Sequence, residues 1–208
     1  LYNTRITKAI KTGLEFNLQS SKSGIIFKKG TLNVENYDFG LTGFISSENM
    51  LDISITGNNI DIAKIRNYLP EKYLNLSSEY DPSGILIIQS RIKGLMTRTS
   101  NPHIEITCSL SDGHVAYGKS DLTINNLSFS GFYSNETKNI PETSSVSFKN
   151  IKAKLGTAEY TGEFILTGFD NPITTLLIKG KVIPEELKEF FDLQSISKAE
   201  GSIDGNLK

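Results

Sequence analysis

The chain has 208 residues, of which 22 are basic and 23 acidic, so its formal net charge is -1. This balance leaves no basic footprint for nucleic acid and no polybasic tract for a membrane surface, so we expect no nucleic-acid partner. The length allows a sizeable core in one domain, and no stretch approaches the roughly 18 consecutive apolar residues of a transmembrane helix.

The sequence begins and ends as an internal piece of a longer protein would. The first residue is Leu1 rather than Met, and the last residues, from Ile203 to Leu207, stop inside an alternating run. We therefore expect an internal or C-terminal fragment of a larger protein, whose targeting and membrane segments lie elsewhere.

Alternation of apolar and polar residues dominates the chain. It is clearest from Leu14 to Leu18, from Ile104 to Leu110 and from Leu122 to Ile124. Such runs predict strands with one apolar and one solvated face. Shorter pieces with this pattern occur at 25–27, 32–34, 41–45, 53–55, 115–117, 151–155, 160–166 and 176–178. Because the gaps are of hairpin length, we predict a mainly β fold with mostly antiparallel strands.

Turn and loop signals separate these runs. Glycine, proline, asparagine and aspartate mark turns at Lys29-Gly30, Asn101-Pro102, Ser111-Asp112-Gly113 and Gly168 to Pro172. The segment from Asn135 to Ser147 contains a proline, many hydroxyl residues and few apolar ones. It predicts an exposed loop.

Two short helices are predicted among the strands. In the first, Asp61 is the N-cap, Ile62, Ile65 and Leu69 form the apolar stripe, and Pro70 ends the helix. Because helices of two to three turns are marginal in water, each must pack its stripe against the sheet.

The second helix begins at Pro184, a residue suited to the first helical position. Glu185 and Glu186 follow in the first turn, where the helix dipole favours acidic side chains. Its apolar stripe consists of Leu187, Phe190 and Phe191.

The unit of strand, glycine and helix occurs twice, at Leu51 to Leu69 and at Thr174 to Leu193. Each copy is followed by a strand that starts with a glycine. Corresponding glycines lie 123 and 117 residues apart: Gly57 with Gly180, and Gly84 with Gly201. We interpret residues 1–208 as a single fragment of a repeating β domain, with repeat modules at about 51–94 and 174–208.

Residues that could carry catalysis are sparse. The two histidines, His103 and His114, are eleven positions apart and match no metal-ligand spacing, and the chain contains no Walker, GxGxxG or GxSxG motif. The single cysteine, Cys108, lies at an apolar position of an alternating run, which favours a buried, inert thiol. We therefore predict a protein that is not an enzyme, with no catalytic residue, no metal and no cofactor.

Three features together resemble a known family. They are the strand-glycine-helix modules, the phrase Asn101-Pro102 before a strand that reaches Asp112-Gly113, and the phrase from Ile124 to Gly131. Through these motifs nearly the whole chain resembles AsmA-like proteins, most of all the large envelope-spanning members of Bacteroidetes-type Gram-negative bacteria.

The AsmA-like resemblance implies an elongated, twisted sheet that curves into an incompletely closed groove, with two short helices. It implies a periplasmic location, within a parent protein that is anchored in the inner membrane and reaches toward the outer membrane. It also implies a part in lipid transport and outer-membrane biogenesis. The implied partners are phospholipid or other lipid acyl chains, both membranes through the parent protein, and other envelope proteins.

An apolar sheet face must be covered by its own curvature, by helices or by a ligand, because exposing many large apolar side chains forgoes more free energy than a fold retains. We predict that the groove binds lipid through the inward residues of the cleanest strands. The predicted lining residues are Leu14, Phe16, Leu18, Ile104, Ile106, Leu110, Leu122 and Ile124.

Other interpretations of the pattern stay open. The same residues can form the sealed core of a β-sandwich or barrel that binds nothing. The alternative function is a non-catalytic β-repeat scaffold or an adhesin-like module for protein contact. A weaker third option is a glycan-binding or glycan-processing module.

Overall fold

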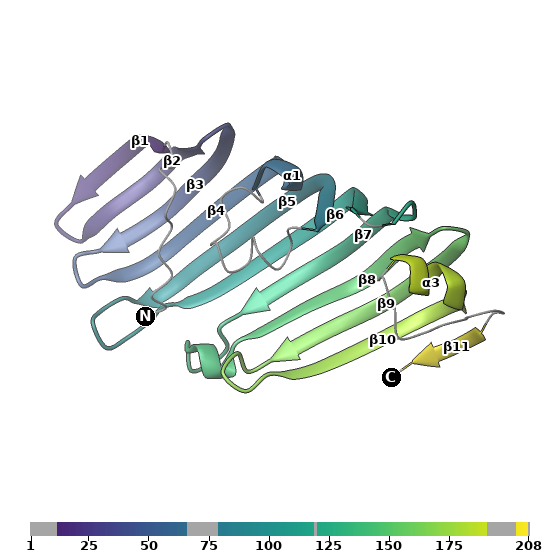
Figure 1. The fold of residues 1–208 in the computed structure, drawn as a ribbon. Helices are drawn as coiled ribbons and strands as arrows, with labels where there is room; N and C mark the ends of the chain where they lie inside the picture. Colours follow the sequence, from purple (N-terminus) through teal and green to yellow (C-terminus); the bar gives the residue numbers. More distant parts are fainter. Residues whose placement is uncertain (1–11, 66–78, 119, 191–202, 208) are drawn as a thin grey trace.

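The computed structural model describes residues 12–65, 79–118, 120–190 and 203–207 (Figure 1). Its eleven strands form one sheet in which spatial order follows chain order and all neighbours are antiparallel. The strands are β1 (Thr12–Ser21), β2 (Gly24–Val34), β3 (Tyr37–Ser46), β4 (Met50–Asp61), β5 (Tyr80–Leu95), β6 (His103–Tyr117), β7 (Thr123–Ser134), β8 (Ser145–Leu155), β9 (Ala158–Thr167), β10 (Ile173–Val182) and β11 (Ile203–Leu207).

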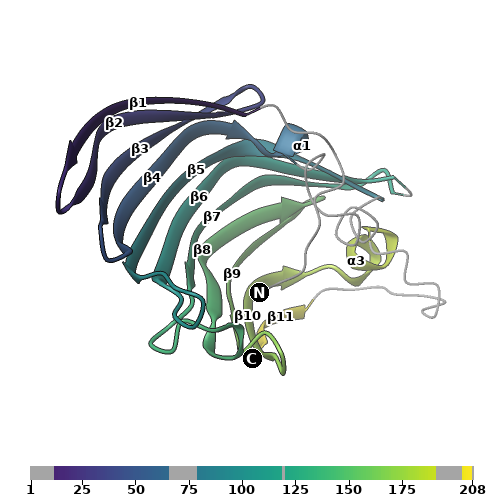
Figure 2. The same cartoon turned by 90° about the vertical axis from the view of Figure 1, so that its left-hand side faces the viewer.

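The helical elements are short. Among the described residues they are α1 (Ile62–Ile65), the 3-10 turn η2 (Pro141–Thr143) and α3 (Pro184–Phe190). The sheet is open, since β1 and β11 each pair with one neighbour, and Figure 2 shows that it curves around an inner side on which α3 lies. The predicted fold class, a curved antiparallel sheet with two short helices, is confirmed.

Strand register separates the side chains into two faces. Ile104 of β6 pairs with Ile92 of β5, while the next residue, Glu105, pairs with Arg91. Directly paired residues point to the same side of a sheet, and successive residues point to opposite sides. Most apolar members of each strand therefore share the inner, concave face, and most polar members share the outer face.

A set of β-bulges bends the strands. The register shifts within β2, β4, β5, β6, β7 and β8. At four of these bulges an asparagine or aspartate has a positive φ of 52° to 56°: Asn59, Asp112, Asn126 and Asn150. Short polar side chains tolerate this conformation, and a bulge increases the local bend and twist of its strand. The bulges therefore account for part of the curvature in Figure 2.

Two predicted turns are wrong for the same reason. Lys29-Gly30 lies within β2, and Ser111-Asp112-Gly113 lies within β6, each beside a register shift. The residue types that suit a tight turn also suit a bulge, and pairing with the neighbouring strands decides between them. The predicted turns at Asn101-Pro102 and from Gly168 to Pro172 do lie between strands.

Glycines on the inner face lie beneath aromatic rings of the paired strand. A Cβ atom on these glycines would lie 2.7 to 3.1 Å from a ring carbon. The pairs are Phe16 with Gly30, Phe39 with Gly57, Phe148 with Gly131, and Tyr160 with Gly180. A ring that covers a glycine shields its backbone and fills the missing volume, so these glycines are packing positions of the sheet.

Both sequence modules have the same order of elements. In the first, β4 leads through α1 to β5, and in the second, β10 leads through α3 to β11. Asp61 caps α1 as predicted, because its Oδ1 accepts a hydrogen bond of 3.0 Å from the backbone N–H of Ala63. Leu69, Pro70 and Gly201 lie outside the described residues. The domain organisation as a repeating unit stays a prediction.

The segment predicted as an exposed loop, Asn135 to Ser147, is only partly so. Its last three residues belong to β8, and two of its polar residues are buried: Asn135 is 5% exposed and Ser144 is 1% exposed. Asn135 accepts a hydrogen bond from the Ile104 N–H at 2.8 Å and donates one to the Pro102 carbonyl at 2.9 Å. These bonds satisfy backbone groups at the start of β6, which composition alone does not reveal.

Candidate functional site

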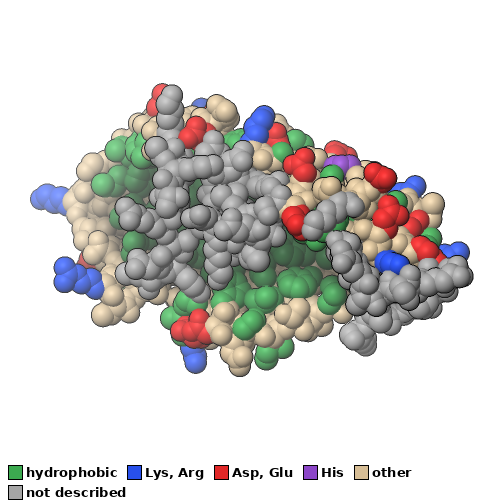
Figure 3. Space-filling view, viewed as in Figure 1, with side chains coloured by type: hydrophobic (Ala, Val, Ile, Leu, Met, Phe, Trp, Pro, Cys, Tyr) green, Lys and Arg blue, Asp and Glu red, His purple; other side chains and the backbone are tan. Residues whose placement is uncertain are grey.

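The concave face of the sheet is the candidate site. Figure 3, viewed as in Figure 1, shows hydrophobic side chains gathered in the hollow of this face. Their apolar surface comes from strands along the whole sheet, because each strand contributes every second residue. Other side chains cover this surface beneath α3, whereas the surface is exposed on β1 and β2.

At the end that carries α3, the inner face forms a closed core. Phe190 of α3 is 1% exposed and packs with Tyr117, Leu155 and Tyr80. Its ring centroid lies 6.1 Å from that of Tyr117, and the rings of Tyr80 and Tyr117 stack at 5.0 Å. We call this cluster of four residues the helix-side core. It supports the expectation that the apolar stripe of a short helix packs on the sheet.

A polar contact also attaches α3 to the sheet. Glu186 Oε1 accepts hydrogen bonds from the backbone N–H of Thr157 at 2.9 Å and from its hydroxyl at 2.8 Å. Thr157 lies in the turn between β8 and β9. The helix is therefore fixed both by an aromatic side chain and by a charged hydrogen-bond acceptor.

At the opposite end, the inner face of β1 and β2 is exposed. The exposed fractions are 56% for Leu14, 41% for Phe16, 50% for Leu18 and 39% for Ile25. Phe16 and Phe27 make an edge-to-face contact with ring centroids 5.4 Å apart. These five residues, which we call the β1-end surface, present apolar side chains to solvent side by side.

The structure divides the predicted lining residues among three places. Leu14, Phe16 and Leu18 belong to the β1-end surface. Ile104 and Ile106 lie half-buried on the inner face of β6, and Leu110 on the same strand is only 4% exposed. Leu122 precedes β7, and both Leu122 and Ile124 pack against the helix-side core. Their shared role in binding lipid stays a prediction.

Several inner-face residues were missed by the sequence analysis. On β3, Phe39 and Leu41 share the inner face, as do Phe148 of β8 and Phe164 of β9, which stack with ring centroids 6.2 Å apart. The signal was present, because Leu41 and its neighbours alternate. It was weaker because glycines such as Gly43 take apolar places in these strands.

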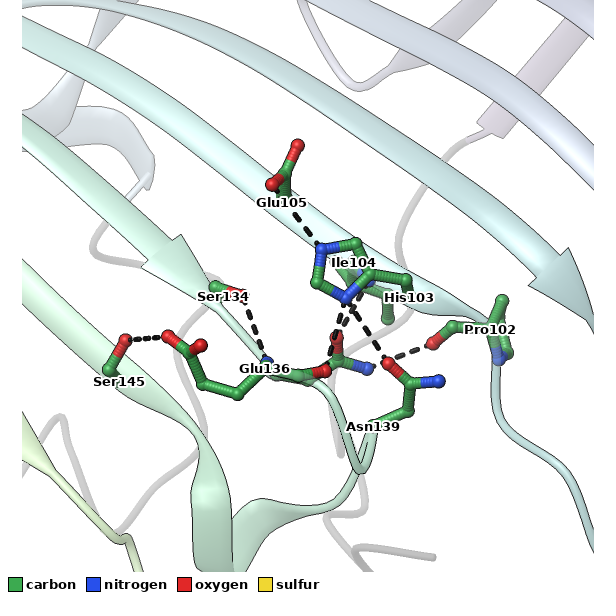
Figure 4. A network of polar contacts seen from close by, with 9 residues as sticks. Pro102, His103, Ile104, Glu105, Ser134, Glu136, Asn139 and Ser145 are labelled. Atoms are coloured by element: carbon green, nitrogen blue, oxygen red, sulfur yellow. Dashed lines mark hydrogen bonds and ion pairs between the residues drawn. The ribbon is translucent and has the colours of Figure 1, made fainter.

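The strand ends opposite α3 are held by a polar network around His103 (Figure 4). Its Nδ1 lies 3.2 Å from both the Glu136 carbonyl oxygen and Asn139 Oδ1, and its Nε2 lies 3.3 Å from Glu105 Oε1. All three neighbours accept hydrogen bonds, so they favour the imidazolium, which donates from both nitrogens. Burial lowers the pKa of His103, but these hydrogen bonds outweigh burial and raise the pKa above its ordinary value.

Among the residues that the structure describes, the other reactive groups do not gather into a site. Within the described ranges, no group of three or more His, Cys, Asp and Glu residues could hold a metal ion. Burial raises the pKa of the Cys108 thiol, which keeps it protonated and unreactive near neutral pH. His114 contacts Asn125 Oδ1 at 2.8 Å through Nδ1, within the sheet. In the described part of the chain, no helix has the length and hydropathy needed to cross a membrane.

Comparison with known proteins does not assign the chain to a family. No family model, curated protein or solved structure matches the chain. The function is therefore argued from the geometry, in which one curved sheet offers a continuous apolar face that a helix closes at one end.

Proposed function

We propose that the inner face binds the acyl chains of phospholipid or another lipid. The observation that carries this proposal is the β1-end surface, where Leu14, Phe16 and Leu18 keep 41% to 56% of their surface exposed on the concave side. The outer face of β1 carries polar residues such as Glu15 and Asn17. On β1, the exposed large apolar side chains thus lie only on the side that a ligand would enter.

The energetics favour an apolar ligand over water on this surface. Full burial of a Leu or Phe side chain stabilises by about 1.5 to 3 kcal/mol, so half-exposed side chains leave part of that free energy unrealised. Each methylene of an acyl chain gains about 0.8 kcal/mol when it leaves water. A chain laid along the inner face would supply both gains without requiring a polar partner.

The antiparallel order also suits a conduit. Each added strand lengthens the groove and leaves its cross-section unchanged, since neighbours pair in chain order. The resemblance to AsmA-like proteins supports the same proposal. We accordingly propose a non-catalytic segment of a periplasmic, inner-membrane-anchored protein that carries phospholipid toward the outer membrane and serves outer-membrane biogenesis.

The decisive experiment compares two faces of the same strand. Leu14→Asp with Leu18→Asp places two charges on the inner face, whereas Asn17→Asp with Gln19→Asp places the same charges on the outer face. We expect the inner-face pair to reduce uptake of a fluorescent phospholipid at least tenfold, because a carboxylate is costly to bury against acyl chains. The outer-face pair should bind as the unaltered protein does.

Two results would overturn the proposal. One is equal uptake by both pairs, with circular dichroism showing that both fold. The other is native mass spectrometry of the unaltered protein showing no co-purified phospholipid, together with no uptake after delipidation. As a further variant, Ile106→Asp tests the centre of the groove: loss of uptake with retained fold indicates an open groove, and unfolding indicates a sealed core at that position.

The alternative is a scaffold or adhesin-like module that contacts envelope proteins and carries no lipid. It predicts that the lipid-free protein still binds its envelope protein partner. Retained pull-down of a defined envelope protein by the Leu14→Asp and Leu18→Asp pair would favour that alternative.

A further inference from the structure

The outer face of the sheet has three adjoining depressions over β5 to β10. The largest has a volume of about 500 Å³ and the two smaller ones about 210 and 220 Å³. Asn150 lines both the largest and its neighbour, while Lys152 and Thr161 line both smaller ones. The three form one shallow trough on the side opposite to the lipid groove.

Lysines dominate the charge of this trough. Lys149, Lys152, Lys154 and Lys179 line it, and the acidic residues among its lining are Glu159 and Glu163. In the described ranges none of these four lysines forms an ion pair. The trough therefore holds positive charge that the sheet itself does not neutralise.

The strand register sets the spacing of these charges. Lys152 pairs with Thr161, which in turn pairs with Lys179, so the two lysines are two strands apart, or about 9.5 Å. Lys152 and Lys154 are alternate residues of one strand, about 6.6 Å apart. Alternate side chains of an extended peptide have this second spacing, so acidic residues at every second position would meet successive lysines.

The largest depression adds contacts of another kind. Its floor carries the hydroxyls of Thr107, Ser109 and Ser130, and its wall includes two large apolar side chains, Ile87 at 41% exposed and Phe132 at 37% exposed. Hydroxyl groups can bond peptide backbone, and an exposed ring with an exposed isoleucine can receive an apolar side chain. A partner that is only an anion would leave these apolar groups in water.

We propose that this outer trough binds an extended, acidic protein segment that carries an apolar side chain. Its carboxylates contact Lys149, Lys152, Lys154 and Lys179, with Lys152 and Lys154 contacted by alternate residues of the segment. Its apolar side chain enters the depression between Ile87 and Phe132. The partner binds on the face opposite to the groove, so protein contact and lipid binding can occur together on one sheet.

The test uses a labelled ten-residue peptide with Glu at alternate positions and Leu or Ser between them, measured by fluorescence anisotropy. The triple variant Lys149→Glu, Lys152→Glu, Lys179→Glu should bind it at least about tenfold more weakly, because three surface charge pairs are replaced by repulsion. Raising salt from 0.05 M to 0.5 M should weaken binding to the unaltered protein, since exposed charges are screened.

A matched control reverses the charge at three lysine positions elsewhere on the same sheet. Lys22→Glu, Lys28→Glu, Lys29→Glu makes the same change in net charge within and beside β2, and it should leave affinity for the peptide within about twofold. Phe132→Ala should weaken binding of the peptide that contains Leu more than that of a peptide with Ser at every intervening position.

Three outcomes would overturn the proposal. They are absence of binding to the unaltered protein, equal loss in both triple variants, and tighter binding of inorganic polyphosphate than of the peptide with no effect of Phe132→Ala. The last result would assign the trough to a polyanion. Fluorescent phospholipid uptake should be unchanged in the trough variants, so failure here is distinguishable from failure of the lipid proposal.

Discussion

The two ends of the inner face are built from the same alternating strands but differ in what covers them. At one end Phe190 closes the helix-side core and is 1% exposed, whereas at the other end Leu14 is 56% exposed. The same chemical pattern therefore yields a conventional core where a helix packs on it and an apolar surface where none does. Apolar alternation determines which face is apolar, and coverage determines whether that face is a core or a candidate binding surface.

The largest expected effect contrasts these two ends directly. Phe190→Ala should lower the free energy of unfolding by about 3 to 5 kcal/mol, because it leaves a cavity among Tyr117, Leu155 and Tyr80. Leu18→Ala should cost about 1 kcal/mol or less, since half of that side chain is already in water. Urea denaturation monitored by tyrosine fluorescence measures both. Similar losses for the two variants would contradict the distinction between core and open surface.

A second prediction concerns the sheet between the two ends. Gly131→Ala should lower the free energy of unfolding by about 1 to 3 kcal/mol, because its Cβ would lie 2.4 Å from Cys108 Sγ and 3.1 Å from the Phe148 ring. Cys108→Ala in the same chain should restore part of the loss. Gly118→Ala is the matched control, since the nearest atom to its Cβ would be 3.7 Å away. Equal urea midpoints for Gly131→Ala and Gly118→Ala would show that this position is not tightly packed.

The smallest effect is expected at the strand ends opposite α3. Because the pKa of His103 is raised in the folded protein, its contribution to stability is fully present below the unfolded pKa near 6.5 and is lost as pH rises through the folded pKa. His103→Gln should therefore lower the melting temperature at pH 5.5 by about 1 °C, and by less at pH 8.5. Scanning calorimetry of both proteins at the two pH values measures this difference, and a larger loss at pH 8.5 would contradict the assigned network.

Much of the fold could be predicted because its signals are local. Alternation in β1 and β6 identified their apolar faces, Asp61 identified the start of α1, and Pro184 with the acidic residues after it identified the start of α3. Each of these depends on neighbours within a few residues. Period-two patterning and helix capping are visible in one segment at a time.

Bulges, polar contacts and coverage were not predictable in this way. Asp112-Gly113 indicates a turn when its segment is considered alone, yet it lies within β6, because pairing continues on both sides of it. Asn135 is buried because it bonds to Pro102 and Ile104, which precede it by more than thirty residues. The lysines of the outer trough come from β8 and β10, and their spacing depends on register.

The sequence by itself determined a mainly β chain with one apolar face, two short helices and few groups suited to catalysis, because periodicity, caps and composition are local properties. The tertiary structure decided between the open, curved sheet that the resemblance implies and the sealed sandwich or barrel that the alternation also allows. It alone decided that α3 closes one end of the inner face and that Leu14, Phe16 and Leu18 stay exposed at the other. The physical reason is that coverage of an apolar face depends on which elements meet across long stretches of chain. Alternation along a strand carries no information about which distant elements pack on it.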